Sequence, residues 1–223
     1  MANRESHIDM LRSIAILFMV EVHAADIITP ANVYTTDPLG LIAASIGGLA
    51  APLFITISGW GSRRAIARRV NSERWELMKW VGVRFGFLMV GQLAVNLIAS
   101  YVFNWYTPGI LSLLAICAVL ALPLARLSSR ALIGLFVLLL LTPFLLASVS
   151  VIDGSWGAVT SAQTVVQWFG LLFIDGTFPL FPWLAFFVLG AIIHDAKSED
   201  ARILLTISAS ITAGVLFSAL AKN

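Results

Sequence analysis

Apolar stretches long enough to cross a lipid bilayer recur along almost the whole chain. The hydrocarbon core of a bilayer is about 30 Å thick, so a helix needs about 20 apolar residues to cross it. Backbone groups find no water there, and such stretches therefore form helices that satisfy their own hydrogen bonds. We expect an all-α, polytopic transmembrane helix bundle. Its seven expected spans are residues 8–28, 40–60, 77–102, 108–126, 131–150, 179–194 and 202–220.

Composition supports a single membrane domain. Of the 223 residues, 59% are hydrophobic and 12% are charged, and the mean hydropathy is +0.93. Soluble domains are far more polar. We therefore expect residues 1–223 to form one integral membrane domain in contact with membrane lipids. The net charge is +2, but the basic residues adjoin apolar stretches. This placement indicates membrane topology and argues against a nucleic-acid partner.

Basic residues fall in every second connection between the expected spans, and the intervening connections contain no Lys or Arg. By the positive-inside rule, the N-terminus is expected on the cytoplasmic side, and the protein in the plasma (inner) membrane of a prokaryote. The basic residues that set this orientation are Arg4, Arg63, Arg64, Arg68, Arg69, Arg74, Lys79, Arg126, Arg130, Lys197 and Arg202.

The stretch 159–174 is apolar but short, and Gln163, Gln167 and Asp175 interrupt or follow it. Counting it as another span would destroy the alternation of basic connections. We therefore expect a re-entrant or interfacial segment at these residues.

The first expected span carries ionisable residues on one helical face. Arg12 and His23 are eleven positions apart, which brings them within about 20° of each other and about 16 Å apart along the helix axis. Asp9 lies three positions before Arg12 and can pair with it. Asp26 lies three positions after His23 and could fix the tautomer of its imidazole. Glu21 is expected about 160° away from His23, facing another element.

Charges inside a bilayer cost about 2.5 to 3.5 kcal/mol each on insertion scales, so these residues are candidates for function. A structural interpretation stays open beside this one. Asp9 and Arg12 could form an ion pair that sets topology at the inner interface, and His23 could be an interfacial residue. If the shared face is functional, we expect the helices to enclose it around a cavity.

The segment from Arg4 to His23 resembles the opening helix of the transmembrane acyltransferase superfamily, which contains the acyltransferase-3 enzymes and the heparan-alpha-glucosaminide N-acetyltransferase-like proteins. The likeness rests on an arginine and a histidine separated by ten residues, at Arg12 and His23. The stretches 51–59 and 178–190 also resemble later helices of that superfamily.

This resemblance implies an enzyme that moves an acyl group, expected to be acetyl, from cytoplasmic acyl-CoA to a hydroxyl or amine of an extracytoplasmic sugar or glycan. His23 would be the catalytic base, with Arg12 and Asp9 as its partners in the motif, and no metal is implied. A thioester is already activated, so the reaction needs a base and stabilisation of the oxyanion. The resemblance and the affinity of guanidinium groups for phosphates suggest that Arg4, Arg12 and Arg84 hold the CoA phosphates.

The chain departs from the superfamily pattern in two ways. Ser13 stands where these proteins commonly have glycine, and the seven expected spans are fewer than the usual ten or so. A homo-oligomer or a partner subunit could supply the missing helices. Two other functions stay open: a transporter of a polar solute or protons along the Asp9, Arg12 and His23 face, and an inactive subunit that binds acyl-CoA.

Several polar or small residues have simpler expected roles. The basic loop from Arg63 to Arg69 is expected to anchor the chain at the headgroups. Arg84 could instead extend its side chain to the inner interface. Ser58, Gly59 and Gly190 are expected to allow close helix packing, and His194 and Asp195 to form a polar helix end.

Overall fold

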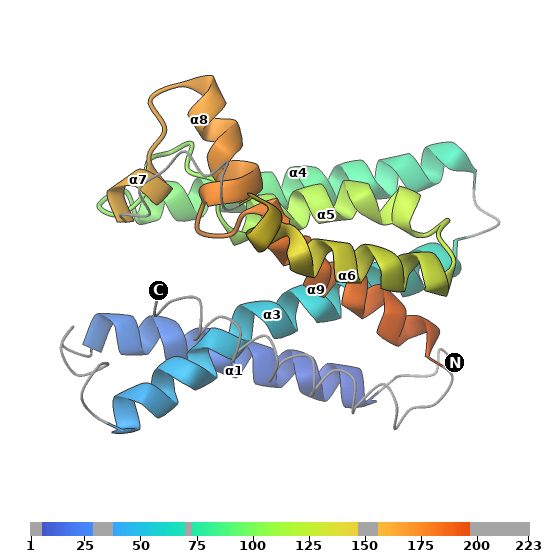
Figure 1. Cartoon of the computed structure of the whole chain (residues 1–223), viewed down its shortest axis with the longest axis horizontal. Helices are drawn as coiled ribbons and strands as arrows, with labels where there is room; N and C mark the ends of the chain where they lie inside the picture. Colours follow the sequence, from blue (N-terminus) through green and yellow to red (C-terminus); the bar gives the residue numbers. More distant parts are fainter. Residues whose placement is uncertain (1–5, 29–37, 70–72, 147–155, 197–223) are drawn as a thin grey trace.

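The computed structural model describes residues 6–28, 38–69, 73–146 and 156–196 (Figure 1). Within these ranges the chain is helical and contains no strand, in agreement with the expected all-α class. The helices are α1 (Ser6–Ile28), α3 (Pro38–Ala67), α4 (Arg74–Ile98), α5 (Ile110–Leu124), α6 (Ser129–Leu146), α7 (Trp156–Thr160), α8 (Val165–Gly170), the π-helix η1 (Leu171–Asp175) and α9 (Leu180–Asp195).

The long helices run alternately up and down. Figure 1 shows the starts of α1, α4 and α6 at the same end of the bundle as the ends of α3, α5 and α9. We call this end, which carries Arg63, Arg68 and Arg130, the basic end. The arrangement brings together helix ends that the charge pattern assigns to one side of the membrane. Residue 4 and residues 197–223, with the expected span 202–220, lie outside the described residues.

Helices α3 and α9 form the centre of the bundle and approach each other backbone to backbone. A methyl group added to Gly59 would overlap the carbonyl oxygen of Phe187, and one added to Gly190 would overlap that of Thr56. Glycine is therefore required at both positions, because no side chain fits between the two backbones. This contact agrees with the packing role expected for Gly59 and Gly190.

Helix α1 packs on α3 through one apolar face. Ile8, Leu11 and Ala15 are buried in a cluster that also contains Ile57 of α3 and Ile193 of α9. These α1 positions are three and four residues apart, the spacing of one helical face.

Helix α4 lies at the side of the bundle and packs on α5. Many of its large apolar side chains are exposed, among them Phe87, Val90 and Leu97. In a membrane, this is the surface that lipid tails would cover. Within the described residues, α4 is the one continuous helix that is long and apolar enough to cross a bilayer by itself.

The seven expected spans are not confirmed as membrane-crossing helices. The segments Val165–Asp175 and Leu180–Asp195 would make a second candidate if counted as one span, but they are bent by 44° at their junction. The helix α5 and the segment Ser129–Pro143 of α6 are apolar but shorter. The described long helices other than α3 begin and end within about four residues of the expected spans, but α3 continues to Ala67, beyond the expected end at residue 60. Helix α1 has 23 residues and is long enough to cross a bilayer, but every stretch of 18 residues within it contains at least three charged residues.

The segment expected to be re-entrant or interfacial contains the short helices α7, α8 and η1, which lie together away from the basic end (Figure 1). Hydrogen bonds tie it to the connection between α4 and α5. The indole N–H of Trp168 donates to the carbonyl of Tyr106 over 2.9 Å, and the Tyr106 hydroxyl donates to the carbonyl of Ala162 over 3.1 Å. None of these three helices is long enough to span a bilayer alone.

Candidate functional site

The expected ion pair at the start of α1 is present. Arg12 Nη1 donates to Asp9 Oδ1 over 3.1 Å, and their side chains are 49% and 36% exposed. The second terminal nitrogen of Arg12 lies beside Gly61 of α3. Asp9 thus orients the guanidinium next to α3, and about half of the Arg12 side chain remains accessible to another ligand.

His23 lies on the same side of α1 as Arg12, and its side chain is exposed. Glu21 points the other way, and its Oε2 atom is buried near Gly47 of α3. This opposition matches the expected angle between Glu21 and His23. The side chain of Asp26 and the whole of Arg4 lie outside what the structure describes, so their expected roles stay predictions.

The face that carries Arg12 and His23 is not enclosed by the described helices. Leu11 and Ala15 point into the bundle, and the neighbouring Arg12 is turned by about 100° from Leu11. The expected cavity around this face stays a prediction. Arg12 and His23 thus lie near the two ends of an open stripe on α1, which is about 16 Å long and has a guanidinium at one end and an imidazole at the other.

Arg84 reaches across from α4 to α3 with its guanidinium. Its Nη2 atom donates to Ser58 Oγ of α3 over 2.9 Å, and its guanidinium lies 5.7 Å from the centre of the Trp80 ring. Ser58, expected only to permit close packing, thus binds a charged group. The structure does not bring Arg84 and Arg12 into contact: Arg84 reaches α3 from α4, whereas Arg12 reaches it from α1.

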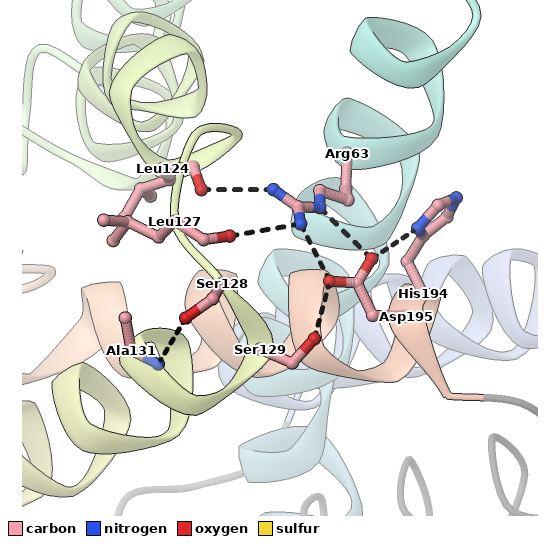
Figure 2. A network of polar contacts seen from close by, with 8 residues as sticks. All are labelled: Arg63, Leu124, Leu127, Ser128, Ser129, Ala131, His194 and Asp195. Carbon is pink, nitrogen blue, oxygen red and sulfur yellow. Dashed lines mark hydrogen bonds and ion pairs between the residues drawn. The ribbon is translucent and has the colours of Figure 1, made fainter.

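A polar network at the basic end was not expected from the sequence (Figure 2). Arg63 of α3 donates to both carboxylate oxygens of Asp195 at the end of α9, over 3.2 and 2.8 Å. The same guanidinium donates to the carbonyls of Leu124 and Leu127, over 3.2 and 3.4 Å. Ser129 also donates to Asp195, over 3.4 Å. One arginine thus joins α3, α9 and the connection between α5 and α6.

His194 belongs to the same network. Its Nδ1 atom lies 3.1 Å from Asp195 Oδ1, and its ring meets Trp60 edge to face with 5.8 Å between centres. The expected polar helix end is therefore more than a solvated terminus. Asp195 is an acidic residue at the end of an otherwise apolar helix, which indicates that it needs a basic partner. The sequence did not identify Arg63 as that partner.

The expected basic loop is partly helical. Arg63 and Arg64 lie in the last turns of α3, and only Arg68 and Arg69 follow its end. Alanine, isoleucine and arginine all permit a helix to continue. The carbonyls and carboxylate around Arg63 also satisfy its charge without a headgroup. Arg63 therefore binds within the protein and not at the headgroups.

Of three comparisons with known proteins, the one with family models agrees with the resemblance of the opening helix. No curated protein and no solved structure matches the chain. The family model described as heparan-alpha-glucosaminide N-acetyltransferase, catalytic, matches residues 4–220 and thus nearly the entire sequence. The chain therefore belongs to the heparan-alpha-glucosaminide N-acetyltransferase catalytic family, a family of acetyltransferase-like membrane enzymes.

Proposed function

We propose that the protein transfers an acetyl group from cytoplasmic acetyl-CoA to a hydroxyl or amine of an extracytoplasmic sugar or glycan. The observation that carries this proposal is the open stripe on α1, where Arg12 and His23 share one exposed face about 16 Å apart. The family match supports acetyl transfer in general. The stripe adds an anion-binding group near the basic end and a base towards the other end.

In the proposed reaction, the acceptor oxygen or nitrogen attacks the thioester carbonyl carbon while its proton passes to the His23 imidazole. The carbon–sulfur bond then breaks, and the CoA thiolate takes the proton from the imidazolium. His23 supplies the general base that this step needs. Arg12, held by Asp9, binds CoA phosphate at the other end of the stripe. Arg84 is a second phosphate ligand in this proposal, and Arg4 a third.

Release of CoA from acetyl-CoA tests the chemistry. The purified protein, reconstituted in nanodiscs, is given acetyl-CoA with glucosaminide or hydroxyl acceptors. Replacement of His23 by alanine should lower the acceptor-dependent rate by about 100-fold or more, since a positioned base typically contributes 10² to 10⁴. Val20→Ala, an exposed change three positions earlier on α1, should retain wild-type activity. Full activity in His23→Ala would refute the proposed base.

The same assay can separate a covalent route from a direct one. An acetyl-imidazole intermediate on His23 would give a burst of CoA release before the acceptor reacts, whereas direct transfer gives none. Both routes use the same imidazole and end with the same products.

Binding of acetyl-CoA tests the donor end independently. Calorimetry in detergent should show saturable binding to the wild type and weaker binding to Arg12→Ala, with Met10→Ala as an exposed control on the same helix turn. A folded wild type that binds no acetyl-CoA but carries a polar solute into proteoliposomes would instead support a transporter. Activity that appears only with a co-purifying protein would support a partner-dependent subunit.

A further inference from the structure

Four side chains from α3, α4 and the turn after α3 form a cationic cluster that the α1 stripe does not include. The guanidinium of Arg69 lies 5.1 Å from the centre of the Trp80 ring, and that of Arg84 lies 5.7 Å from the same centre. Arg84 also donates to Ser58 Oγ. We call Ser58, Arg69, Trp80 and Arg84 the Trp80 cluster. It links α3 and α4 through side chains near the basic end.

The cluster extends from the basic end into the bundle. Arg69 lies just beyond the end of α3, whereas Arg84 is ten residues into α4, about 15 Å along its axis. Ser58 lies nine residues before the end of α3, at about 13 Å. Arg84 therefore reaches sideways to a hydroxyl at its own depth, although its long side chain could extend to the headgroups. The site holds a guanidinium where an uncompensated charge is costly.

Neither arginine has a carboxylate partner within the described part of the chain. Arg69 donates through Nη1 to the carbonyl of Ala65 over 3.0 Å, and Arg84 donates to Ser58. Each guanidinium has five N–H donors, and most of them have no acceptor among the described residues. By contrast, Arg12 and Arg63 are each paired with an aspartate. Partly buried cations usually have an anionic partner, and here that partner has to come from outside these residues.

We infer that the Trp80 cluster is a phosphate-binding subsite that holds the phosphate-bearing end of the CoA donor. The inference rests on the proposed function and adds Arg69, Trp80 and Ser58 to its donor site. Arg69 and Arg84 bind phosphate oxygens, for which the fork of a guanidinium is well suited. Trp80 positions both groups by its contacts with their planes, and Ser58 keeps Arg84 turned towards α3.

The spacing of the two guanidinium groups favours a ligand with several phosphates. Both lie near one indole ring, so their centres are at most about 11 Å apart. The phosphate of an anionic lipid stays at the interface, where Arg69 lies, whereas the Arg84 guanidinium binds Ser58, which lies about 13 Å before the end of α3. A molecule that carries both a diphosphate and a separate phosphate, as CoA does, can contact the two arginines together.

Binding of unacetylated CoA tests the subsite without any need for acetyl transfer. Calorimetry is performed on the full chain in nanodiscs of phosphatidylcholine, for Arg69→Gln, Arg84→Gln and the matched control Arg68→Gln. Arg68 is exposed and adjacent to Arg69 in sequence, and its replacement removes the same charge. Loss of Arg69 or Arg84 should raise the Kd at least tenfold, whereas the Arg68 change should alter it less than twofold.

Two further variants show whether a loss of binding comes from misfolding or from the phosphate contact. Arg84→Lys keeps the positive charge but not the fork, so it should retain the wild-type unfolding temperature and bind CoA between the wild type and Arg84→Gln. Trp80→Leu keeps both arginines but removes the surface that positions them, and should also raise the Kd. Equal Kd values for the wild type, Arg69→Gln and Arg84→Gln would overturn the subsite.

A second arm identifies the source of the phosphate. The protein in nanodiscs that contain phosphatidylglycerol should bind CoA with a Kd within threefold of its Kd in pure phosphatidylcholine. If phosphatidylglycerol instead abolishes CoA binding, and co-purifies with the wild type but not with Arg84→Gln, the occupant is a lipid and the donor assignment is wrong.

The subsite and the proposed function can fail separately. CoA binding that depends on Arg69 and Arg84, in a protein that transfers no acetyl group to any acceptor, would support the subsite and count against the function. Acetyl transfer with an unchanged KM for acetyl-CoA in both glutamine variants would support the function and overturn the subsite.

Discussion

Arg63 and Asp195 are 132 positions apart in the sequence, yet they form a two-point ion pair at the basic end of the bundle (Figure 2). Their side chains are only 16% and 19% exposed. The pair joins the end of α3 to the end of α9, and Arg63 also binds the last carbonyl of α5 at Leu124. One contact therefore fixes the relative positions of three helix ends.

Breaking this pair should be more costly than breaking the exposed pair on α1. Arg63→Gln leaves the partly buried Asp195 carboxylate without its cation, and we expect a loss of about 3 kcal/mol. The unfolding temperature in detergent should fall by roughly 5 to 10 °C. Asp9→Asn, which removes the partner of Arg12 from the more exposed pair, should cost about 1 kcal/mol or less. Equal shifts for both variants would contradict this ranking.

Gly190 should not tolerate even one added methyl group. Gly190→Ala would place its Cβ against the backbone of Thr56 and Trp60, so α3 and α9 would have to separate. We expect a large fall in the yield of monodisperse protein and in its unfolding temperature. Gly134→Ala in α6 is the matched control, because no other atom lies near the added carbon. It should be neutral or stabilising by up to about 1 kcal/mol, since alanine favours helix more than glycine does.

The buried Asn96 should be needed for the connection between α4 and α5. Its side chain is 1% exposed and donates to the carbonyls of Trp105 and Thr107, over 3.0 and 2.8 Å, while accepting from Gln92. Asn96→Ala leaves these groups without partners, and this should lower the free energy of unfolding by about 2 kcal/mol or more. Asn96→Asp should cost more, because a carboxylate cannot donate to the two carbonyls. Thermal unfolding measures both, with the exposed Gln163→Ala as the control.

Cysteine labelling should establish which side of the membrane each end of the bundle faces. The native Cys117 is fully buried, so it should not react with a membrane-impermeant maleimide in the folded protein. A cysteine introduced by Gln163→Cys should be labelled in intact cells, whereas one introduced by Arg68→Cys should be labelled only after the membrane is opened. The reverse pattern would contradict the proposed orientation and place His23 on the cytoplasmic side.

The positions of the helices could be predicted from the sequence because apolar stretches and basic flanks are local signals. The expected spans 8–28 and 179–194 agree closely with α1 and α9. The pairing of Asp9 with Arg12 was predictable for the same reason, since three residues along one helix set their distance. The relation between Arg12, His23 and Glu21 around α1 also follows from helix geometry alone.

Contacts between helices could not be predicted in this way, because they join residues that are far apart in the sequence. Arg63 looked like a residue of a headgroup-binding loop until α9 placed Asp195 beside it, and Ser58 looked like a packing residue until α4 placed Arg84 beside it. The exposure of the Arg12 and His23 face was also decided by which side of α1 packs on α3.

The amino-acid sequence by itself therefore determined the all-helical class, the approximate positions of the described long helices and the faces of α1, because hydropathy and helical periodicity act within about twenty residues of each other. Only the tertiary structure decided which charges pair between different helices and which still have donors to offer a ligand. That outcome depends on contacts such as Arg63 with Asp195, which form only after the separate helices have packed.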